Sequence, residues 1–224
     1  MMTNSKLTTH RVLVGPGDPI PARVQKLARE SVQQDVRGLQ REGVLEAAGG
    51  KKPLVGPSDM VLLNRWMIQA HIFEKKLAGR VSLFGALFGA EASKVEAGVV
   101  HEAKRFAILE DEENGPVEYG VAVRLTAATT TATGKVHLTL PNLAAHAQLN
   151  SEKAMIGISV AGYAGPLGEM LPTPKRLDVE SYVGYREAFE ALQKRVFGEA
   201  GAKMISPVVL SYGGDLTDDE EPPD

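Results

Sequence analysis

The sequence predicts an α+β fold, with a central antiparallel sheet packed by two or three helices. Near both ends of the chain, apolar residues recur every three or four positions, which is the spacing of amphipathic helices. Between these regions the apolar period changes to two, as expected for strands with one buried face. The chain has no internal repeat and no strand–helix–strand alternation, so a parallel sheet is not expected.

Three segments have features of helices. Ala22–Glu42 carries its apolar residues on one stripe and its charges mostly elsewhere, which is typical of a surface helix. Asp59–Ala78 is apolar nearly all round and suggests a central helix, although Trp66–Phe73 also fits a strand. A third helix is expected from an N-cap at Asp178 to about Phe197, just before Gly198. Its expected inward residues are Val179, Tyr182, Phe189, Leu192 and Val196.

The alternation of strands is clearest in Lys94–Thr133, which we expect to form one long antiparallel hairpin. The charged run Glu110–Glu113, followed by Asn114 and Gly115, supplies the chemistry of a turn at its tip. Shorter strands are expected at Val136–Leu140, Ala154–Tyr163 and Ile205–Tyr212.

The chain of 224 residues is long enough for one well-packed domain. We expect a flexible N-terminal segment at 1–21, a single α+β domain at 22–214 and a disordered acidic tail at 215–224. Two interpretations of the helix at 22–42 stay open, as part of the domain or as a detachable arm.

The charge balance bears on the class of partner. Its 25 basic and 28 acidic residues give a net charge of -3, and only 5% of residues are aromatic. Neither a basic surface nor a base-stacking platform is indicated, so we expect no nucleic-acid partner.

The composition and motifs indicate no catalytic centre. The absence of cysteine excludes thiolate metal sites and cysteine nucleophiles. Gly157–Ala161 is close to the Gly-x-Ser-x-Gly motif around a nucleophilic serine, but all five histidines precede Ser159 and no helix follows it. The histidines also lack the spacing of helical zinc ligands. We therefore expect no catalytic residue, no metal site and no cofactor, with Ser159 packed in a strand.

An uncharged doublet, Leu-Phe-Gly-Ala repeated over 83–90, is the candidate contact segment. A core segment is the ordinary interpretation, but large phenylalanines beside glycines also suit an apolar contact surface. The sequence therefore predicts a non-enzymatic binding or assembly protein that binds itself or another protein. The expected contact residues for a partner or a membrane are Leu83, Phe84, Leu87 and Phe88.

Two alternatives to this function stay open. One is a membrane-acting, pore-forming-like protein using residues 81–133, since about 9–11 residues per strand suffice to cross a bilayer. The other is a hydrolase or transferase whose site is assembled only in space. We see no signal peptide and no transmembrane helix, so a cytoplasmic location is expected, with export by a non-classical route left open.

Overall fold

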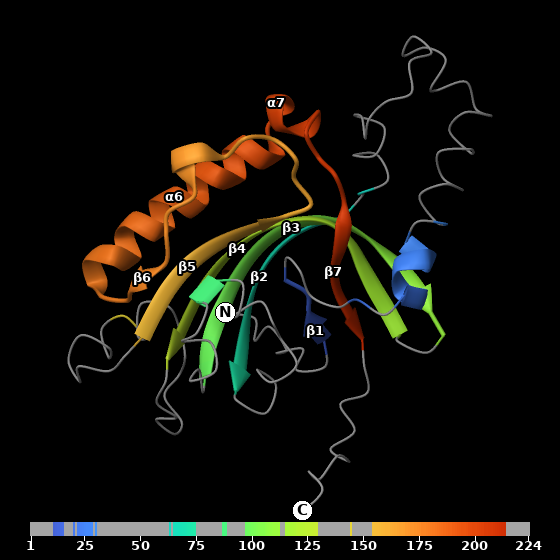
Figure 1. Cartoon of the computed structure of the whole chain (residues 1–224), viewed down its shortest axis with the longest axis horizontal. Helices are drawn as coiled ribbons and strands as arrows, with labels where there is room; N and C mark the ends of the chain where they lie inside the picture. The colour runs from blue at the N-terminus through green and yellow to red at the C-terminus, as the bar shows by residue number, and fades with distance from the viewer. Residues whose placement is uncertain are drawn as a thin grey trace, which may run out of the picture.

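The structure, a computed structural model, describes residues 11–15, 20, 22–28, 30, 63, 65–74, 87–88, 97–112, 115–129, 144 and 154–213. Its strands form one curved antiparallel sheet with the order β1-β7-β4-β3-β2, and β5 and β6 extend it beside β4 (Figure 1). The predicted α+β class with a central antiparallel sheet is confirmed. The strands are β1 (Arg11–Leu13), β2 (Arg65–Glu74), β3 (Ala97–Asp111), β4 (Gly115–Thr129), β5 (Ala154–Ala161), β6 (Lys175–Arg176) and β7 (Val208–Gly213).

The predicted long hairpin forms the centre of the sheet. Strands β3 and β4 pair without interruption from Ala97 opposite Thr129 to Asp111 opposite Gly115. Gly115 has a φ of 66°, a left-handed conformation that glycine adopts without steric cost. The other edge of β4 is divided between two partners, since residues 117–120 pair with β7 and residues 122–129 pair with β5.

Gly120 lies where β4 changes partner, and it permits an unusually close approach of two backbones. A β-carbon on Gly120 would lie 2.1 Å from the carbonyl oxygen of Arg105 and 2.7 Å from the Cα of Phe106 on β3. A β-carbon on Gly162 (φ 75°) would in turn lie 2.3 Å from the carbonyl oxygen of Gly120.

We expect Gly120→Ala to destabilise the protein at the upper end of the ~1–3 kcal/mol typical of overpacked sites, because backbone atoms cannot rotate away. Gly184→Ala is the control, since a β-carbon on Gly184 meets nothing within 4 Å and alanine favours the helix. Urea unfolding of both variants measures the difference, and an equally small effect in both would contradict the close approach.

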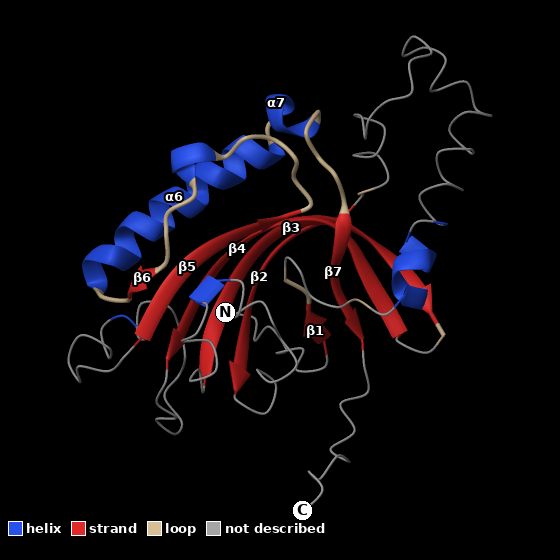
Figure 2. Cartoon of the chain, in the orientation of Figure 1, coloured by secondary structure: helices blue, strands red, loops and turns tan. Residues whose placement is uncertain are grey.

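Two helices late in the chain lie together at one end of the sheet (Figure 2). Helix α6 (Val179–Phe197) lies over β4 and β5 on the outer side of the curve, followed by the short helix α7 (Glu199–Ala202) (Figure 2). A single 3-10 turn, η3 (Gly168–Met170), precedes them. A separate helical stretch at 22–28 packs Val24 and Ala28 against Val117 and Val209, near the tip of the hairpin.

The bounds of α6 match the expected helix, and its N-cap is Asp178 as predicted. The Asp178 carboxylate accepts a hydrogen bond from the Ser181 amide at 2.7 Å, and the Ser181 hydroxyl accepts one from the Asp178 amide at 2.9 Å. The hydrogen bonds from Ser181 hold the pKa of the Asp178 carboxyl below its ordinary value.

We expect Asp178→Ala to lower the free energy of unfolding by ~1 kcal/mol, because the first turn of α6 loses its capping box. Asp178→Asn keeps an oxygen acceptor at the same position and should lose much less. Thermal unfolding of both variants compares them, and equal losses would contradict the capping role.

One inward position of α6 was predicted wrongly. Val179 is 46% exposed, whereas Tyr185, Phe189 and Leu192 are buried in the core beneath the helix. Val179 precedes Tyr185 by six residues, and six steps of about 100° put it well outside the stripe that starts at Tyr185. Tyr182 packs partly against the same core, while Phe189, Leu192 and Val196 are inward as expected.

The expected helix at Asp59–Ala78 is wrong over residues 65–74, which form strand β2. Each residue of β2 pairs with β3, from Arg65 opposite Phe106 to Glu74 opposite Ala97. Pairing along ten residues outweighs the helical spacing of this segment, whose aromatic and β-branched residues also suit a strand.

The remaining expectations are confirmed in part or lie outside the described residues. Strand β5 covers most of the expected Ala154–Tyr163, and β7 begins at Val208 within the expected Ile205–Tyr212. The helix at 22–42 is described as a helix over 22–28. The expected strand at 136–140 and the acidic tail at 215–224 lie outside the described residues.

Candidate functional site

The face of the sheet opposite α6 carries a buried cluster of charged side chains. Along β3 and β4, Ala103, Val123 and Leu125 pack toward the core under α6, so the residues between them point to the other face. Four of the residues on that other face are ionisable and no more than 1% exposed. They are Glu102, Lys104, Glu118 and Arg124, which we call the buried charge cluster.

Glu102 is the centre of the cluster. Its Oε1 accepts from Arg124 Nε at 2.6 Å, and its Oε2 lies 3.1 Å from Lys104 Nζ. Gln69 on β2 donates its Nε2 to the same Oε2 at 2.8 Å. His71 Nε2 lies 3.7 Å from the same Oε2, which is longer than a hydrogen bond. Glu102 therefore links β2, β3 and β4.

The rest of the cluster extends to β7 and to the chain next to β1. Arg124 donates to the carbonyl oxygens of Val14 and Leu210, the latter at 2.8 Å. Glu118 pairs with Lys104 and accepts from the Ser211 hydroxyl at 2.7 Å. Arg124 uses Nε, Nη1 and Nη2, so its guanidinium holds three segments in one geometry.

The environment of Glu102 keeps it ionised. Burial alone raises the pKa of the Glu102 carboxyl, but Arg124, His71 and Lys104 together outweigh burial and hold that pKa well below its ordinary value. The two glutamates and two cations balance in charge, as buried ions require.

The lowered pKa of Glu102 predicts a loss of stability in acid. A carboxyl whose folded pKa lies below its unfolded value stabilises the fold above the unfolded value, and this is lost as pH falls toward the folded value. We expect the free energy of unfolding to fall below about pH 4.3, and to fall less steeply in Glu102→Gln. Urea unfolding between about pH 3 and 7 measures how steeply the free energy of unfolding depends on pH. Glu190→Gln, in the exposed Arg186–Glu190 pair, is the control. Equal pH dependence in the wild type, Glu102→Gln and Glu190→Gln would contradict this account.

The geometry of the cluster is that of a structural network. The carboxylates of Glu102 and Glu118 are engaged by cations and hydrogen bonds, and neither is left as an accessible base. Ser159 lies in the middle of β5 opposite Arg124, not on the turn between strand and helix that the Gly-x-Ser-x-Gly motif forms. Burial lowers the pKa of His101, which points from β3 toward the α6 side, away from Ser159 and Glu102.

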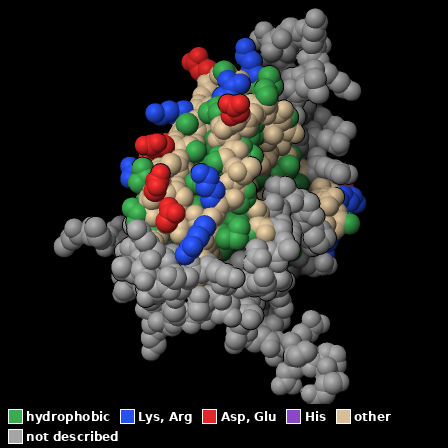
Figure 3. Space-filling model, turned by 60° about the vertical axis from the view of Figure 1, so that its left-hand side comes forward, with side chains coloured by type: hydrophobic (Ala, Val, Ile, Leu, Met, Phe, Trp, Pro, Cys, Tyr) green, Lys and Arg blue, Asp and Glu red, His purple; other side chains and the backbone are tan. Residues whose placement is uncertain are grey.

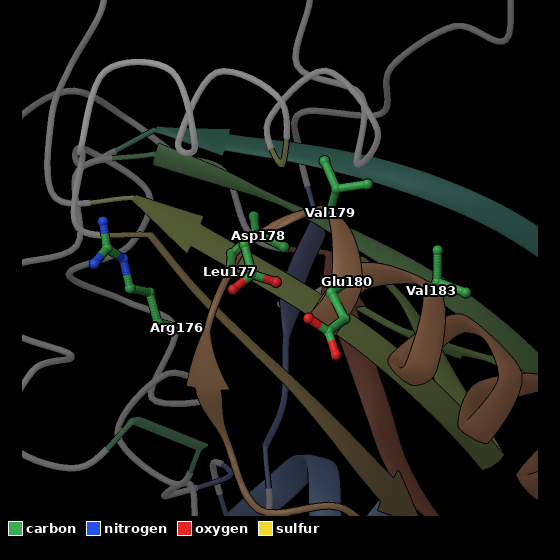
Figure 4. Close-up of a pocket in the computed structure, with 6 residues that line it drawn as sticks. All are labelled: Arg176, Leu177, Asp178, Val179, Glu180 and Val183. Atoms are coloured by element: carbon green, nitrogen blue, oxygen red, sulfur yellow. The ribbon is translucent and has the colours of Figure 1, made fainter.

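Within the described residues, no group of three His, Asp or Glu side chains converges to hold a metal ion. A hollow of about 690 Å³ lies beside the start of α6 (Figure 4). Its Asp178 is occupied as the helix N-cap, and the two valines in it point to the same side of the helix. No buried polar group of the six lining residues lacks a partner, so the hollow shows no built ligand site. The lining residues are Arg176, Leu177, Asp178, Val179, Glu180 and Val183.

The contact residues expected from sequence are only partly described. Leu83 and Phe84 lie outside the described residues. Leu87 is half-buried and Phe88 is 6% exposed, and a β-carbon added to Gly157 of β5 would lie 3.4 Å from the side chain of each. In the single chain Phe88 therefore packs against the sheet.

A surface that the sequence did not single out lies along β2. Trp66, Met67 and Ile68 are 49%, 40% and 61% exposed, although each is a large apolar side chain. No described strand pairs with the outer edge of β2, which ends the strand order of the sheet. We call this surface, Trp66 to Ala70 with its open strand edge, the β2 edge.

Trp66 connects the β2 edge to the helical layer. Its ring meets the ring of Phe197 edge to face, with centroids 4.7 Å apart. This contact fixes one side of the indole, while about half of the residue stays exposed on the α6 side of the sheet. The exposed surface of α6 is mixed: acidic and basic side chains lie among hydrophobic ones (Figure 3), and Val179 and Val183 are 46% and 50% exposed.

The chain was also compared with known proteins. No protein-family model, no curated protein and no solved structure matches it. None of the described helices is both long enough and apolar enough to cross a membrane.

Proposed function

We propose that this protein is a non-enzymatic binding and assembly protein whose contact surface is the β2 edge. The observation that carries the proposal is the coincidence of a ten-residue strand, whose outer edge no described strand covers, with three exposed large apolar residues. Such edges pair readily with another strand, because unpaired amide and carbonyl groups form a template for a ladder.

The buried charge cluster supports this function because it holds β2 against the rest of the sheet. Gln69 on β2 donates to Glu102, which Arg124 and Lys104 hold in place. A strand that must present its outer edge to a partner gains from a fixed inner side, because less conformational freedom is lost on binding. The candidate segment with Leu83 and Phe84 stays a second proposed contact of the same protein.

Site-specific photo-crosslinking in the native cell tests the proposal. A photoreactive side chain at Ile68 should give a protein adduct identifiable by mass spectrometry, and one at Leu83 tests the second contact. The same group at Val183, which is 50% exposed on α6, is the matched control. The absence of an adduct at Ile68, or equal adducts at Ile68 and Val183, would contradict the β2 edge as the contact surface.

A membrane-acting function is the second candidate, and one observation favours it. The four members of the buried charge cluster share one face of the hairpin, and each strand has fifteen residues, more than the ~9–11 needed to cross a bilayer. Liposome dye release tests it: leakage caused by the full chain would favour it over assembly at the β2 edge. No described constellation of residues favours a hydrolase or transferase.

A further inference from the structure

We infer that the occupant of the β2 edge is a second copy of this chain, paired antiparallel along β2 and centred on Ile68. The inference rests on the proposed function and names its partner. The two copies would then share one continuous sheet through the outer edges of their β2 strands.

The strands at the described margins of the sheet differ in how well they resist pairing. Strand β1 has three residues and β6 has two, and short strands are a common protection against edge-to-edge association. Strand β2 has ten residues, and between Arg65 and Glu74 it contains no proline, glycine, lysine, arginine or acidic residue. The usual protections of an edge are therefore missing along eight consecutive positions of β2, Trp66 to Phe73.

An edge of this kind can pair with the same edge of a second copy of the chain. An antiparallel strand edge is self-complementary under a twofold axis perpendicular to the sheet, since that axis reverses the strand and keeps each face on its own side. The side chains from Trp66 to Ala70 carry no charge, so they bring no like charges together at the centre of such a pair. A partner with a strongly charged strand would find no opposite charge there.

The exposure and size of the side chains indicate which residue lies at the centre of the paired strands. Ile68 is the most exposed of the large apolar residues described, and it would lie opposite Ile68 of the second copy. Each Trp66 would lie opposite Ala70 of the second copy, so a large side chain meets a small one on the α6 side. On the other face Met67 would lie opposite Gln69 of the second copy.

The absence of cysteine makes the pairing directly testable by disulfide formation in the full-length purified chain. Residues directly opposite in an antiparallel pair have Cα atoms about 4.5–5.5 Å apart, within the range of a disulfide. Ile68→Cys should therefore give a disulfide-linked dimer under mild oxidation. Met67→Cys is the matched control, because its two copies would be diagonal neighbours about 7–8 Å apart.

A mixed experiment fixes the register. Trp66→Cys and Ala70→Cys, oxidised together, should give the heterodimer in preference to either homodimer. A disulfide at Met67 in place of Ile68, or no preference in the mixture, would overturn the inferred pairing. All these positions are exposed, so the variants should fold like the wild type, which circular dichroism checks.

The outcomes separate this inference from the proposed function. If the chain stays monomeric while Ile68 crosslinks to a different protein in the cell, the binding function stands and the second copy is overturned. If neither experiment gives a product, both are overturned. A dimer linked at Ile68, with the heterodimer preference, supports both.

Discussion

We expect Arg124→Met to lower the free energy of unfolding by about 3–5 kcal/mol, because it breaks a buried ion pair by removing one partner. Arg124 is 1% exposed and pairs with Glu102 at 2.6 Å. The substitution leaves Glu102 buried with less compensating charge, and it removes the donors to the carbonyl oxygens of Val14 and Leu210. Urea unfolding measures the loss.

The double variant Glu102→Met/Arg124→Met tests whether uncompensated charge causes this loss. With both charges removed, the cluster keeps the Lys104–Glu118 pair and stays balanced, so the double variant should recover part of the stability lost in Arg124→Met. Arg186→Met, in the exposed pair with Glu190, is the control and should cost less than about 1 kcal/mol. A double variant less stable than Arg124→Met would count against a dominant effect of uncompensated charge.

We expect Phe189→Ala to cost about 3–5 kcal/mol, since it removes a large buried aromatic side chain from the core beneath α6. Phe189 is 7% exposed and belongs to the same hydrophobic cluster as Leu125 and Ile156 of the sheet. Because α6 packs against β4 and β5, the loss should also loosen β5. Hydrogen exchange of the β5 amides, together with thermal unfolding, measures both effects.

The matched control for Phe189→Ala is Val183→Ala on the exposed side of the same helix. Val183 is 50% exposed, so its truncation should change stability by no more than about 0.5 kcal/mol. Comparable losses in the two variants would show that α6 does not pack as described.

The central hairpin and α6 were predictable because local patterns suffice for them. Alternating residues in Val117–Thr129 and a tip at Glu112 predict two paired strands without knowledge of the rest of the chain. Asp178 and Gly198 similarly define both ends of α6. In these segments the local preference and the tertiary environment agree.

Strand β2 and the buried charge cluster were not predictable in the same way. The spacing of β2 fits a helix and a strand, and only its pairing with β3 decides between them. Lys104 and Arg124 have the alternation of solvent-facing strand residues, yet they are buried because Glu102 and Glu118 lie on the same face. Whether these two side chains are buried depends on partners that are distant in the sequence, and no local sequence pattern reveals those partners.

The exposed apolar residues were assigned to a different segment for a related reason. The doublet at 83–90 is an uncharged run with two phenylalanines, which makes it a natural candidate for a contact surface. The structure instead places Phe88 against β5 and leaves Trp66 and Ile68 exposed. Which apolar side chains are exposed depends on which strand lies at the edge of the sheet, and only the order of the strands in the fold shows that.

Sedimentation equilibrium of the full chain, with Ile68→Lys beside the wild type, tests the role of the β2 edge most directly. The wild type should show a reversible monomer–dimer equilibrium, and Ile68→Lys should weaken it at least about tenfold, because two lysines would face each other at its centre. Val183→Lys, at a site on α6 that is 50% exposed against 61% for Ile68, should dimerise like the wild type. A wild type that stays monomeric at every concentration, or a dimer that Ile68→Lys leaves intact, would contradict self-association through this edge.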